Sequence, residues 1–363
     1  MIAQPWRIVA GVVSLAAAWG TPAAAQLRIA DGITASLSGR LNTQFNTTSV
    51  DEVEGTPLAG SEFLIRRARL TLDVTFSSLI MARVEPDYGT GSSFALRDAF
   101  VRFSFAPAFR ATVGQFKRPF DVFGLTSSTQ ILVIERTGGV RGVDACGALR
   151  TVCSFSALTE GLLYADRDLG VMIDGASPGR TLRYAVAVTN GQPVNAREQN
   201  GNKSFTARVA VAPLRNVVIG VTGARKDYQH PTTGAERFAT GWAVDAELGN
   251  FTSGPHVQAG VVGGGNWRTA TTVDGVARFL AAQVIATYRA SLPHGHLRAV
   301  EPLFRVSWGD PDTDAADDGG WLLTPGTMLH FGGRTKLEAN LDIWLPQVGP
   351  EELSFKSQMS FYF

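Results

Sequence analysis

Residues 109–120 read Phe109-Arg-Ala-Thr-Val-Gly-Gln-Phe-Lys-Arg-Pro-Phe120, and this stretch marks the place where the regular pattern of the chain is interrupted. Phe109 to Val113 alternates apolar and polar residues, which is typical of a β-strand. From Phe120 to Leu163, roughly forty residues follow without sustained apolar periodicity, and a connection of that length inside a compact domain is usually functional. The rest of the chain reads as short hairpins. We therefore expect this segment to be the one long insertion into an otherwise regular β-structure.

Alternation of apolar and polar residues begins at Ile33 and continues to the C-terminus. In the first segment Leu37 and Phe45 fall on one face, opposite Arg40 and Asn42. A period of two places every second side chain on the same face of a strand. About sixteen such segments can be counted, and an even number is typical of bacterial outer-membrane barrels. They cover residues 33–46, 67–76, 80–85, 98–105, 109–113, 169–173, 182–188, 205–211, 217–221, 238–248, 257–261, 280–288, 297–308, 321–331, 335–344 and 353–363.

The connections between these segments alternate in length. Short connections at 77–79, 106–108, 213–215 and 332–333 alternate with longer polar ones at 47–60, 191–203, 226–236 and 309–319. Short turns on one side and longer loops on the other indicate an outer-membrane barrel. A soluble sandwich also has hairpins, but its loops need not alternate in length.

The first 25 residues have the features of a secretory signal peptide. Arg7 forms a short basic region, residues 8–19 form an apolar core, and Ala23 to Ala25 form a small-residue cleavage site before Gln26. The sequence therefore predicts an exported mature domain of residues 26–363. No later stretch approaches ~20 consecutive apolar residues, so strands and not helices would cross a membrane.

The charge of the mature chain is balanced. The full chain has 33 Lys and Arg against 32 Asp and Glu, and loss of Arg7 with the signal peptide leaves 32 against 32. Bulk charge therefore indicates no particular partner, and we expect no nucleic-acid binding.

Alternation alone does not say which face points inward, because a soluble barrel would bury the apolar face and expose the polar one. Three features favour a membrane barrel: the signal peptide, the large set of strands, and the terminal strand that ends at Ser360-Phe-Tyr-Phe363. Backbone in lipid must be paired without a free edge, and pairing of the terminal strands achieves this.

Cys146 and Cys153 are the only two cysteines of the chain. An even number in an exported protein favours a disulfide. Such a bond needs the two Cα atoms within ~7 Å, so the 120–163 segment would double back there. The expected role of the disulfide is to stiffen the segment.

Other motifs do not support a metal site, a cofactor or an enzyme. The aspartates between Asp310 and Asp318 do not match a calcium loop, because Ala315 stands where Gly is needed and Trp321 where the closing Glu is needed. His294 and His296 lack a third metal ligand nearby. No G-x-S-x-G motif or other recognisable nucleophile motif is present.

Several segments together resemble the phosphate-selective porin O and P family of Gram-negative outer membranes. They are spread over most of the mature chain, and each is modest alone. They are Phe63-Leu-Ile-Arg-Arg-Ala-Arg-Leu70, Leu96-Arg-Asp-Ala-Phe-Val101, Val113-Gly-Gln-Phe-Lys-Arg-Pro-Phe120, Leu125-Thr-Ser-Ser128, Glu135-Arg136, Asp166-Arg-Asp-Leu-Gly-Val-Met172, Glu301-Pro-Leu-Phe-Arg305 and the closing Phe363.

The resemblance implies a homotrimer of sixteen-stranded antiparallel transmembrane β-barrels, with a constriction loop folded into the lumen after Phe120. It also implies that Phe363 is the signal read by the barrel-assembly machinery. In the family, inward arginines and lysines form the anion path. The corresponding candidates here are Arg40, Arg67, Arg69, Arg83, Arg102, Lys117, Arg136, Arg141, Arg150 and Arg167. Two features depart from a strictly phosphate-selective member: lysine is scarce, and the mature charge is neutral.

These observations predict an outer-membrane porin for passive diffusion of small hydrophilic solutes, either general or preferring anions or phosphate. An alternative for the arginines is that they pair with nearby acids such as Asp73, Glu85, Asp98, Asp166 and Asp168. Two alternatives for the whole protein are a non-conducting structural or adhesive outer-membrane barrel and an exported soluble all-β binding protein. The expected surroundings are outer-membrane lipid and small hydrophilic or anionic solutes.

Overall fold

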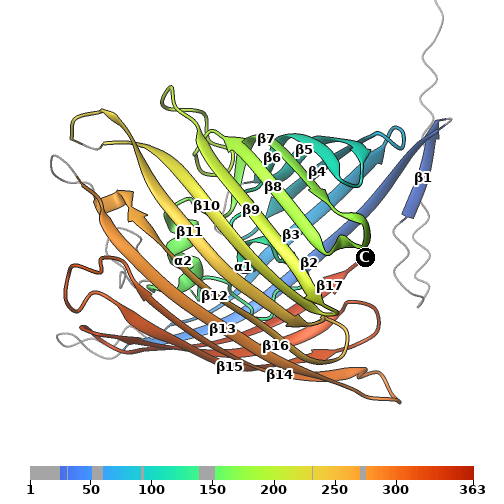
Figure 1. The fold of residues 1–363 in the computed structure, drawn as a ribbon. Helices are drawn as coiled ribbons and strands as arrows, with labels where there is room; N and C mark the ends of the chain where they lie inside the picture. The colour runs from blue at the N-terminus through green and yellow to red at the C-terminus, as the bar shows by residue number, and fades with distance from the viewer. Residues whose placement is uncertain are drawn as a thin grey trace, which may run out of the picture.

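The computed structural model describes residues 25–30, 32–50, 60–90, 94–138, 152–230, 232–269 and 275–363 (Figure 1). Most of the expected signal peptide lies outside these ranges. Within these ranges there are two α-helices and two short 3-10 helices: α1 (Val122–Leu125), α2 (Phe155–Gly161), η2 (Pro178–Arg180) and η3 (Trp267–Thr269). The strands are β1 (Ala25–Ala30), β2 (Ile33–Val50), β3 (Gly60–Thr75), β4 (Ile80–Tyr88), β5 (Ala95–Ala106), β6 (Phe109–Lys117), β7 (Arg167–Ala176), β8 (Leu182–Thr189), β9 (Ser204–Leu214), β10 (Val217–Gln229), β11 (Glu236–Gly249), β12 (Gly254–Asn266), β13 (Ala277–Ser291), β14 (Ala299–Asp310), β15 (Gly320–His330), β16 (Lys336–Pro346) and β17 (Glu352–Tyr362).

Strands β2 to β17 form a closed antiparallel barrel of 16 strands. Each strand pairs with the next, and β17 pairs with β2 from Glu352 opposite Val50 to Tyr362 opposite Arg40. The expected strand number and fold class are confirmed. Closure leaves no sheet edge in the lipid, where an unpaired backbone group would be costly.

One further strand, β1, was not predicted. The last strand ends where the backbone of Phe363 pairs with Gly39, at N–O distances of 2.8 and 3.0 Å. The edge of β2 from Ile33 to Leu37 therefore has no partner in β17, and β1 folds back to pair with it. The turn between them contains Gly32 at a φ of 79°, a left-handed conformation that glycine adopts without strain.

The two faces of the strands differ as the alternation predicts. In β3 the outward Leu70 and Leu72 are exposed, whereas the inward Arg69 is 4% exposed. Aromatic pairs lie on outward positions at both ends of the wall, such as Phe45 with Phe63 and Phe105 with its neighbour Phe109. An apolar outer band with aromatic residues at its borders is typical of barrels in lipid. Among the helices in the described ranges, none is long and apolar enough to cross a membrane.

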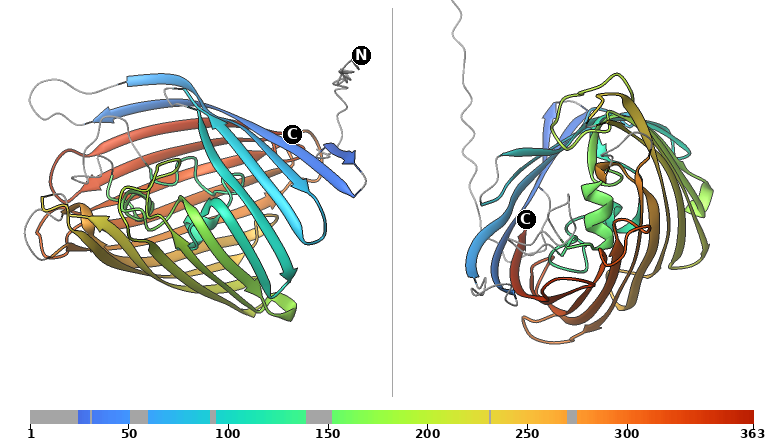
Figure 2. Two further views of the ribbon diagram at one scale, coloured as in Figure 1. Left: turned by 90° about the horizontal axis from the view of Figure 1, so that it is seen from above. Right: turned by 90° about the vertical axis from the view of Figure 1, so that its left-hand side faces the viewer.

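The described parts of residues 118–166, which we call the inner segment, lie inside the barrel (Figure 2). They comprise residues 118–138 and 152–166 and contain both α-helices. Each helix begins at a side-chain cap: the carboxylate of Asp121 accepts from Gly124 N at 2.7 Å, and the hydroxyl of Ser154 accepts from Ala157 N at 3.1 Å. Such caps satisfy backbone donors that a helix start leaves free.

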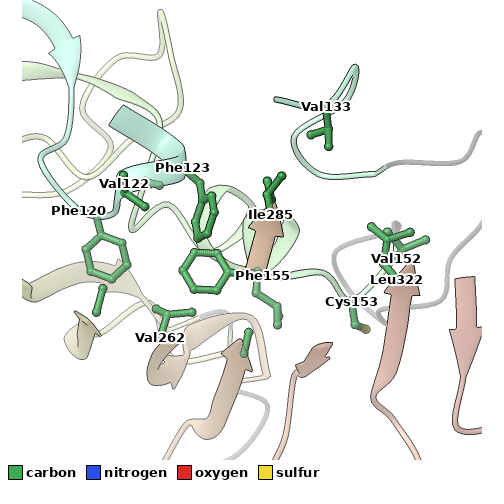
Figure 3. Packing of buried hydrophobic residues seen from close by; sticks show 14 of the residues in the cluster. Phe120, Val122, Phe123, Val133, Val152, Cys153, Phe155, Val262, Ile285 and Leu322 are labelled. Atoms are coloured by element: carbon green, nitrogen blue, oxygen red, sulfur yellow. The ribbon is translucent and has the colours of Figure 1, made fainter. Parts of the chain in front are cut away.

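The inner segment packs on the inward faces of β11 to β16 and forms the main hydrophobic cluster with them (Figure 3). Phe123 and Phe155 meet edge to face, with ring centroids 5.0 Å apart. Because this part of the barrel wall is covered, nine of its inward positions are apolar where a water-filled lumen would require polar ones. These wall residues are Ala243, Val262, Phe279, Ala281, Ile285, Leu303, Leu322, Met328 and Trp344.

Polar contacts hold the inner segment in place at its start and in its middle. Arg118 Nη2 donates to the carboxylate of Asp168 at 2.7 Å and to the carbonyl of Gln192 at 2.7 Å. Arg305 of β14 donates to the carbonyls of Glu135 and Arg136, both at 2.9 Å. Polar groups buried beneath the inner segment are thereby hydrogen-bonded, as burial requires.

The disulfide predicted between Cys146 and Cys153 would also lie in this part of the chain. Cys153 is disulfide-bonded. Cys146 lies outside the described residues.

We predict that the buried Arg118–Asp168 pair stabilises the junction of the inner segment with the barrel wall. Both side chains are only 1% exposed. Asp168→Ala is expected to lower the free energy of unfolding by about 3–5 kcal/mol, because the guanidinium would stay buried without its carboxylate. Urea-induced unfolding in detergent micelles measures this change.

The control is Asp73→Ala, which removes the partner of Arg83 from a pair whose side chains are 34% and 25% exposed. A partly solvated pair of this kind contributes about 1 kcal/mol or less. Equal losses in the two variants would contradict the assignment of Asp168 as an anchor.

Candidate functional site

A cavity of about 520 Å³ lies between the inner segment and the strands β2 to β7, and we call it the first lumen cavity. Residues 125–129 of the inner segment contribute to its wall, among them Ser127 and Ser128. Its lining holds six cationic side chains against three Asp and Glu side chains, together with the C-terminal residue Phe363. The cations are Arg40, Arg69, Arg83, Lys117, Arg167 and Arg334, and the acids are Asp73, Glu85 and Asp98.

Arg40 is a cation of this cavity that has no carboxylate at ion-pair distance in the described part of the chain. Its Nη2 donates to the hydroxyl of Ser128 at 2.6 Å, and its Nε and Nη1 have no acceptor in the described part of the chain. The side chain is 5% exposed, and Arg69 stands directly opposite it on β3. Arg69 is itself paired with Glu85 and Asp87, so the uncompensated charge at this point of the wall is that of Arg40.

Three other arginines of the first lumen cavity are paired with acids. Arg69 contacts Glu85 at 2.9 Å and Asp87 at 2.6 Å. Arg83 binds both carboxylate oxygens of Asp73 at 2.7 and 2.8 Å. The third pair joins Arg167 and Asp98 at 2.5 Å. These three arginines therefore agree with the alternative hypothesis that lumen arginines pair with nearby acids.

A second lumen cavity of about 700 Å³ adjoins the same inner segment from the side of β5 to β11. Seven cations and four acids line it. Arg110 pairs with Asp174, and Arg208 binds Asp245 at 2.6 Å. Within the described ranges, four of its cations have no carboxylate at ion-pair distance: Arg102, Lys117, Arg180 and Arg183.

Lys117 lines both cavities and also forms hydrogen bonds with the inner segment. Its Nζ donates to the carbonyls of Gly124 and Thr126, each at 2.8 Å, at the end of α1. A cation at a helix C-terminus satisfies free carbonyls and interacts favourably with the helix dipole. The position of Ser127 and Ser128 at the first lumen cavity therefore depends on Lys117.

Arg66 and Arg67 both lie on the lumen side of β3, although they are adjacent in sequence. The pairing of β2 with β3 shifts there, since Asn42 faces Arg67 and Thr43 faces Ile65. Arg66 is thus the extra residue of a bulge, which redirects a side chain. It binds Glu135 of the inner segment at 2.5 and 2.9 Å, and Arg67 approaches the same carboxylate at 3.9 Å.

Six of the ten cations predicted from sequence line the two cavities: Arg40, Arg69, Arg83, Arg102, Lys117 and Arg167. Arg67 contacts Glu135 of the inner segment instead. Arg136 belongs to the inner segment itself and donates to the carbonyl of Thr126 at 3.0 Å. Arg141 and Arg150 lie outside the described residues.

Sequence reasoning missed several lumen cations, namely Arg66, Arg110, Arg180, Arg183, Arg208 and Arg334. Strand alternation placed Arg110, Arg183 and Arg208 on polar faces and could have found them. No sequence signal marks Arg66, because its inward direction depends on the bulge.

The structure also shows the surroundings of the histidines and of the acidic loop after β14. In the parts of the chain that the structure covers, no three His, Cys, Asp or Glu side chains are grouped as metal ligands. His256 contacts Glu247 at 2.9 Å, and His330 contacts Glu301 at 2.7 Å. In the loop after β14, burial and then the neighbouring Asp310 raise the pKa of Asp318 to about 6.

The closed barrel, its polar lumen and the inner segment define the class of outer-membrane porins. The chain belongs to the phosphate-selective porin O and P family, whose model matches residues 38–250. No match was found among curated proteins.

Several solved structures share the fold. The outer-membrane channel DcaP of Acinetobacter baumannii is 14% identical, with a TM-score of 0.63, and the match covers 92% of this chain and 99% of DcaP. An anion-selective porin from Comamonas acidovorans is 14% identical, with a TM-score of 0.62 and coverage of 91% and 100%. The trimer form of OmpT from Vibrio cholerae is 12% identical, with a TM-score of 0.53 and coverage of 91% and 100%. At these identities the likeness shows the fold.

We predict that acid weakens the contact between β3 and the inner segment. Burial alone raises the pKa of Glu135, but the guanidinium groups of Arg66 and Arg67 outweigh it and lower the pKa from 4.5 to about 2. A depressed carboxyl pKa stabilises the fold above the unfolded value, and this contribution is lost as the pH falls from about 4.5 towards about 2. The melting temperature should therefore decrease across that interval.

The same titration with Glu135→Gln tests the assignment, because the amide does not ionise. This variant should show a smaller decrease over the interval than the natural protein. Glu351→Gln, at an exposed position outside the lumen, is the control and should follow the natural protein. Identical pH profiles for Glu135→Gln and the natural protein would refute the prediction.

Proposed function

We propose that the protein is a general porin with a preference for anions, through which small hydrophilic solutes diffuse passively. The observation that carries this proposal is the excess of cations in the lumen: six against three acidic side chains around the first cavity, and seven against four around the second. The full chain is nearly neutral, with 33 basic and 32 acidic residues. The excess is therefore a property of the lumen.

Selectivity of this kind follows from the sign and position of fixed charge along a narrow path. Low-dielectric walls focus the field of the uncompensated cations and raise the local concentration of anions. Arg40 and Arg102 contribute most, because paired arginines such as Arg83 have their field largely cancelled by a carboxylate a few ångströms away. The inner segment, as the proposed constriction, keeps solutes close to these charges.

Phosphate selectivity is the narrower form of the proposal. Arginine forks bind phosphate oxygens through charge-assisted hydrogen bonds when they are free of other acceptors. In the first lumen cavity Arg69, Arg83 and Arg167 are already paired with carboxylates. This arrangement supports a general anion preference more than a dedicated phosphate site.

The proposed assembly is a homotrimer in outer-membrane lipid. The OmpT structure from Vibrio cholerae, which has the same fold, is a trimer form. Phe363 is proposed as the contact for the barrel-assembly machinery, since its ring is 59% exposed and its backbone closes the barrel against Gly39. Native electrophoresis of the detergent-extracted protein, before and after heating, tests the trimer.

We predict that removing two of the uncompensated cations, one from each cavity, lowers anion preference. The double variant Arg40→Gln with Arg102→Gln should decrease the ratio of chloride to potassium permeability by about twofold or more, because the local positive potential falls. Reversal potentials in planar bilayers under a KCl gradient give this ratio, and addition of phosphate tests for block.

Arg298→Gln is the matched control, because Arg298 is an exposed cation in the turn before β14 and lines neither lumen cavity. It should leave the permeability ratio unchanged. Cation-selective channels in the natural protein would overturn the anion preference. Folded protein without conductance would favour a structural barrel.

A further inference from the structure

The inward faces of β5 to β8 carry a small apolar patch that barrel closure does not require. It consists of Phe100, Phe116, Met172 and Ala187, which are between 0% and 9% exposed. The patch is separate from the large cluster beneath the inner segment. Inward positions of a water-filled porin are usually polar. A Phe–Phe–Met surface at this place therefore calls for a ligand-related explanation.

The patch belongs to the wall of the second lumen cavity. Phe100, Phe116 and Met172 line that cavity, and so do Val122 and Leu125 of the inner segment. Its volume of about 700 Å³ is within the range of small-molecule sites, which combine apolar walls with a few placed polar groups. The first lumen cavity, in contrast, is lined mainly by serine, threonine and charged side chains.

A free cation lies directly on this patch. The guanidinium carbon of Arg102 is 5.0 Å from the ring centroid of Phe100, and its Nε donates to the hydroxyl of Thr112 at 3.0 Å. In the described part of the chain no carboxylate is at ion-pair distance from Arg102. Its remaining N–H groups are therefore available to a solute. Arg83 is 6.0 Å from the same ring, but its guanidinium is held by Asp73.

An aromatic surface beside an unpaired guanidinium indicates which kind of solute would fit: one with both an anionic group and an apolar ring. A carboxylate can bind Arg102 through charge-assisted hydrogen bonds. A ring attached to that carboxylate can pack against Phe100, Phe116 and Met172, and burial of its apolar surface adds affinity. A compact, strongly hydrated anion such as inorganic phosphate gains nothing from the apolar wall.

We propose that the second lumen cavity binds organic anions that carry a carboxylate on an aromatic ring. Arg102 holds the carboxylate, and Phe100 with its neighbours holds the ring. This proposal deepens the anion preference proposed above and rests on it for transport, but binding itself can be measured without a current.

The experiment compares benzoate, acetate, benzyl alcohol and inorganic phosphate. Isothermal titration calorimetry on the detergent-solubilised full chain measures binding, and block of single-channel current measures access from the pore. Benzoate should bind about tenfold more tightly than acetate, because only benzoate buries a ring. It should also exceed benzyl alcohol, which has the ring without the charge, and phosphate, which has charge without the ring.

Two variants separate the parts of the site. Arg102→Gln should weaken benzoate binding about tenfold through loss of the charged hydrogen bonds. Phe100→Leu keeps an apolar side chain but removes the aromatic face, and it should weaken benzoate about threefold while acetate is unaffected. Phe304→Leu is the matched control, because Phe304 is an outward residue of β14 that is 45% exposed. It should change neither affinity.

The outcomes distinguish this site from the general function. Equal affinity for benzoate and acetate, tighter binding of phosphate, or a Phe100→Leu variant with unchanged benzoate binding would overturn the proposal. Chloride-selective conductance together with any of these results would leave the anion-preferring porin in place. Benzoate binding in calorimetry without any conductance would keep the site and refute the porin function.

Discussion

The pairing of β17 with β2 is the constraint on which the rest of this structure depends. In lipid, each backbone N–H and C=O needs an intramolecular partner, and only a sheet without an edge provides one. The chain meets this requirement by ending at Phe363, whose backbone pairs with Gly39. Because Gly39 has no side chain, the Phe363 ring packs directly on the backbone there, and a Cβ at position 39 would require the ring to shift. Where β17 stops, β1 covers the exposed edge of β2.

Closure creates an interior, and the inner segment divides it into two different environments. Over β11 to β16 the segment forms a packed core with Phe155, Leu158 and Tyr164, against apolar residues on the inward face of the wall. Over β2 to β9 the lumen keeps its cavities and most of its uncompensated cations. Polar anchors at Arg118 and Arg305 fix the segment between these regions. The segment therefore places solutes beside the charged wall.

The distribution of charge explains how a nearly neutral chain can prefer anions over cations. Acids and bases are nearly equal in number over the whole chain, but cations outnumber acids around the two lumen cavities. Several arginines are neutralised by carboxylates on neighbouring strands, as Arg69 is by Glu85 and Asp87. Arg40 and Arg102 lack such a partner in the described structure, so their field extends into the pore. Pairing, and not the number of arginines, decides which of them act on a solute.

The sequence by itself determined the barrel, because a period-two pattern repeated over sixteen segments sorts the residues into two faces, and the large set of strands with the predicted signal peptide favours the apolar face outward. It also determined the position of the inner segment, because the pattern is interrupted only between Phe120 and Leu163, and it identified six of the cavity-lining cations. Tertiary structure alone decided the rest. The bulge that turns Arg66 inward depends on register between strands, and register is not visible within one strand. Whether an arginine is paired depends on distances between residues far apart in the chain. For the same reason, the apolar patch at Phe100 became recognisable only when four strands, β5 to β8, placed its members side by side.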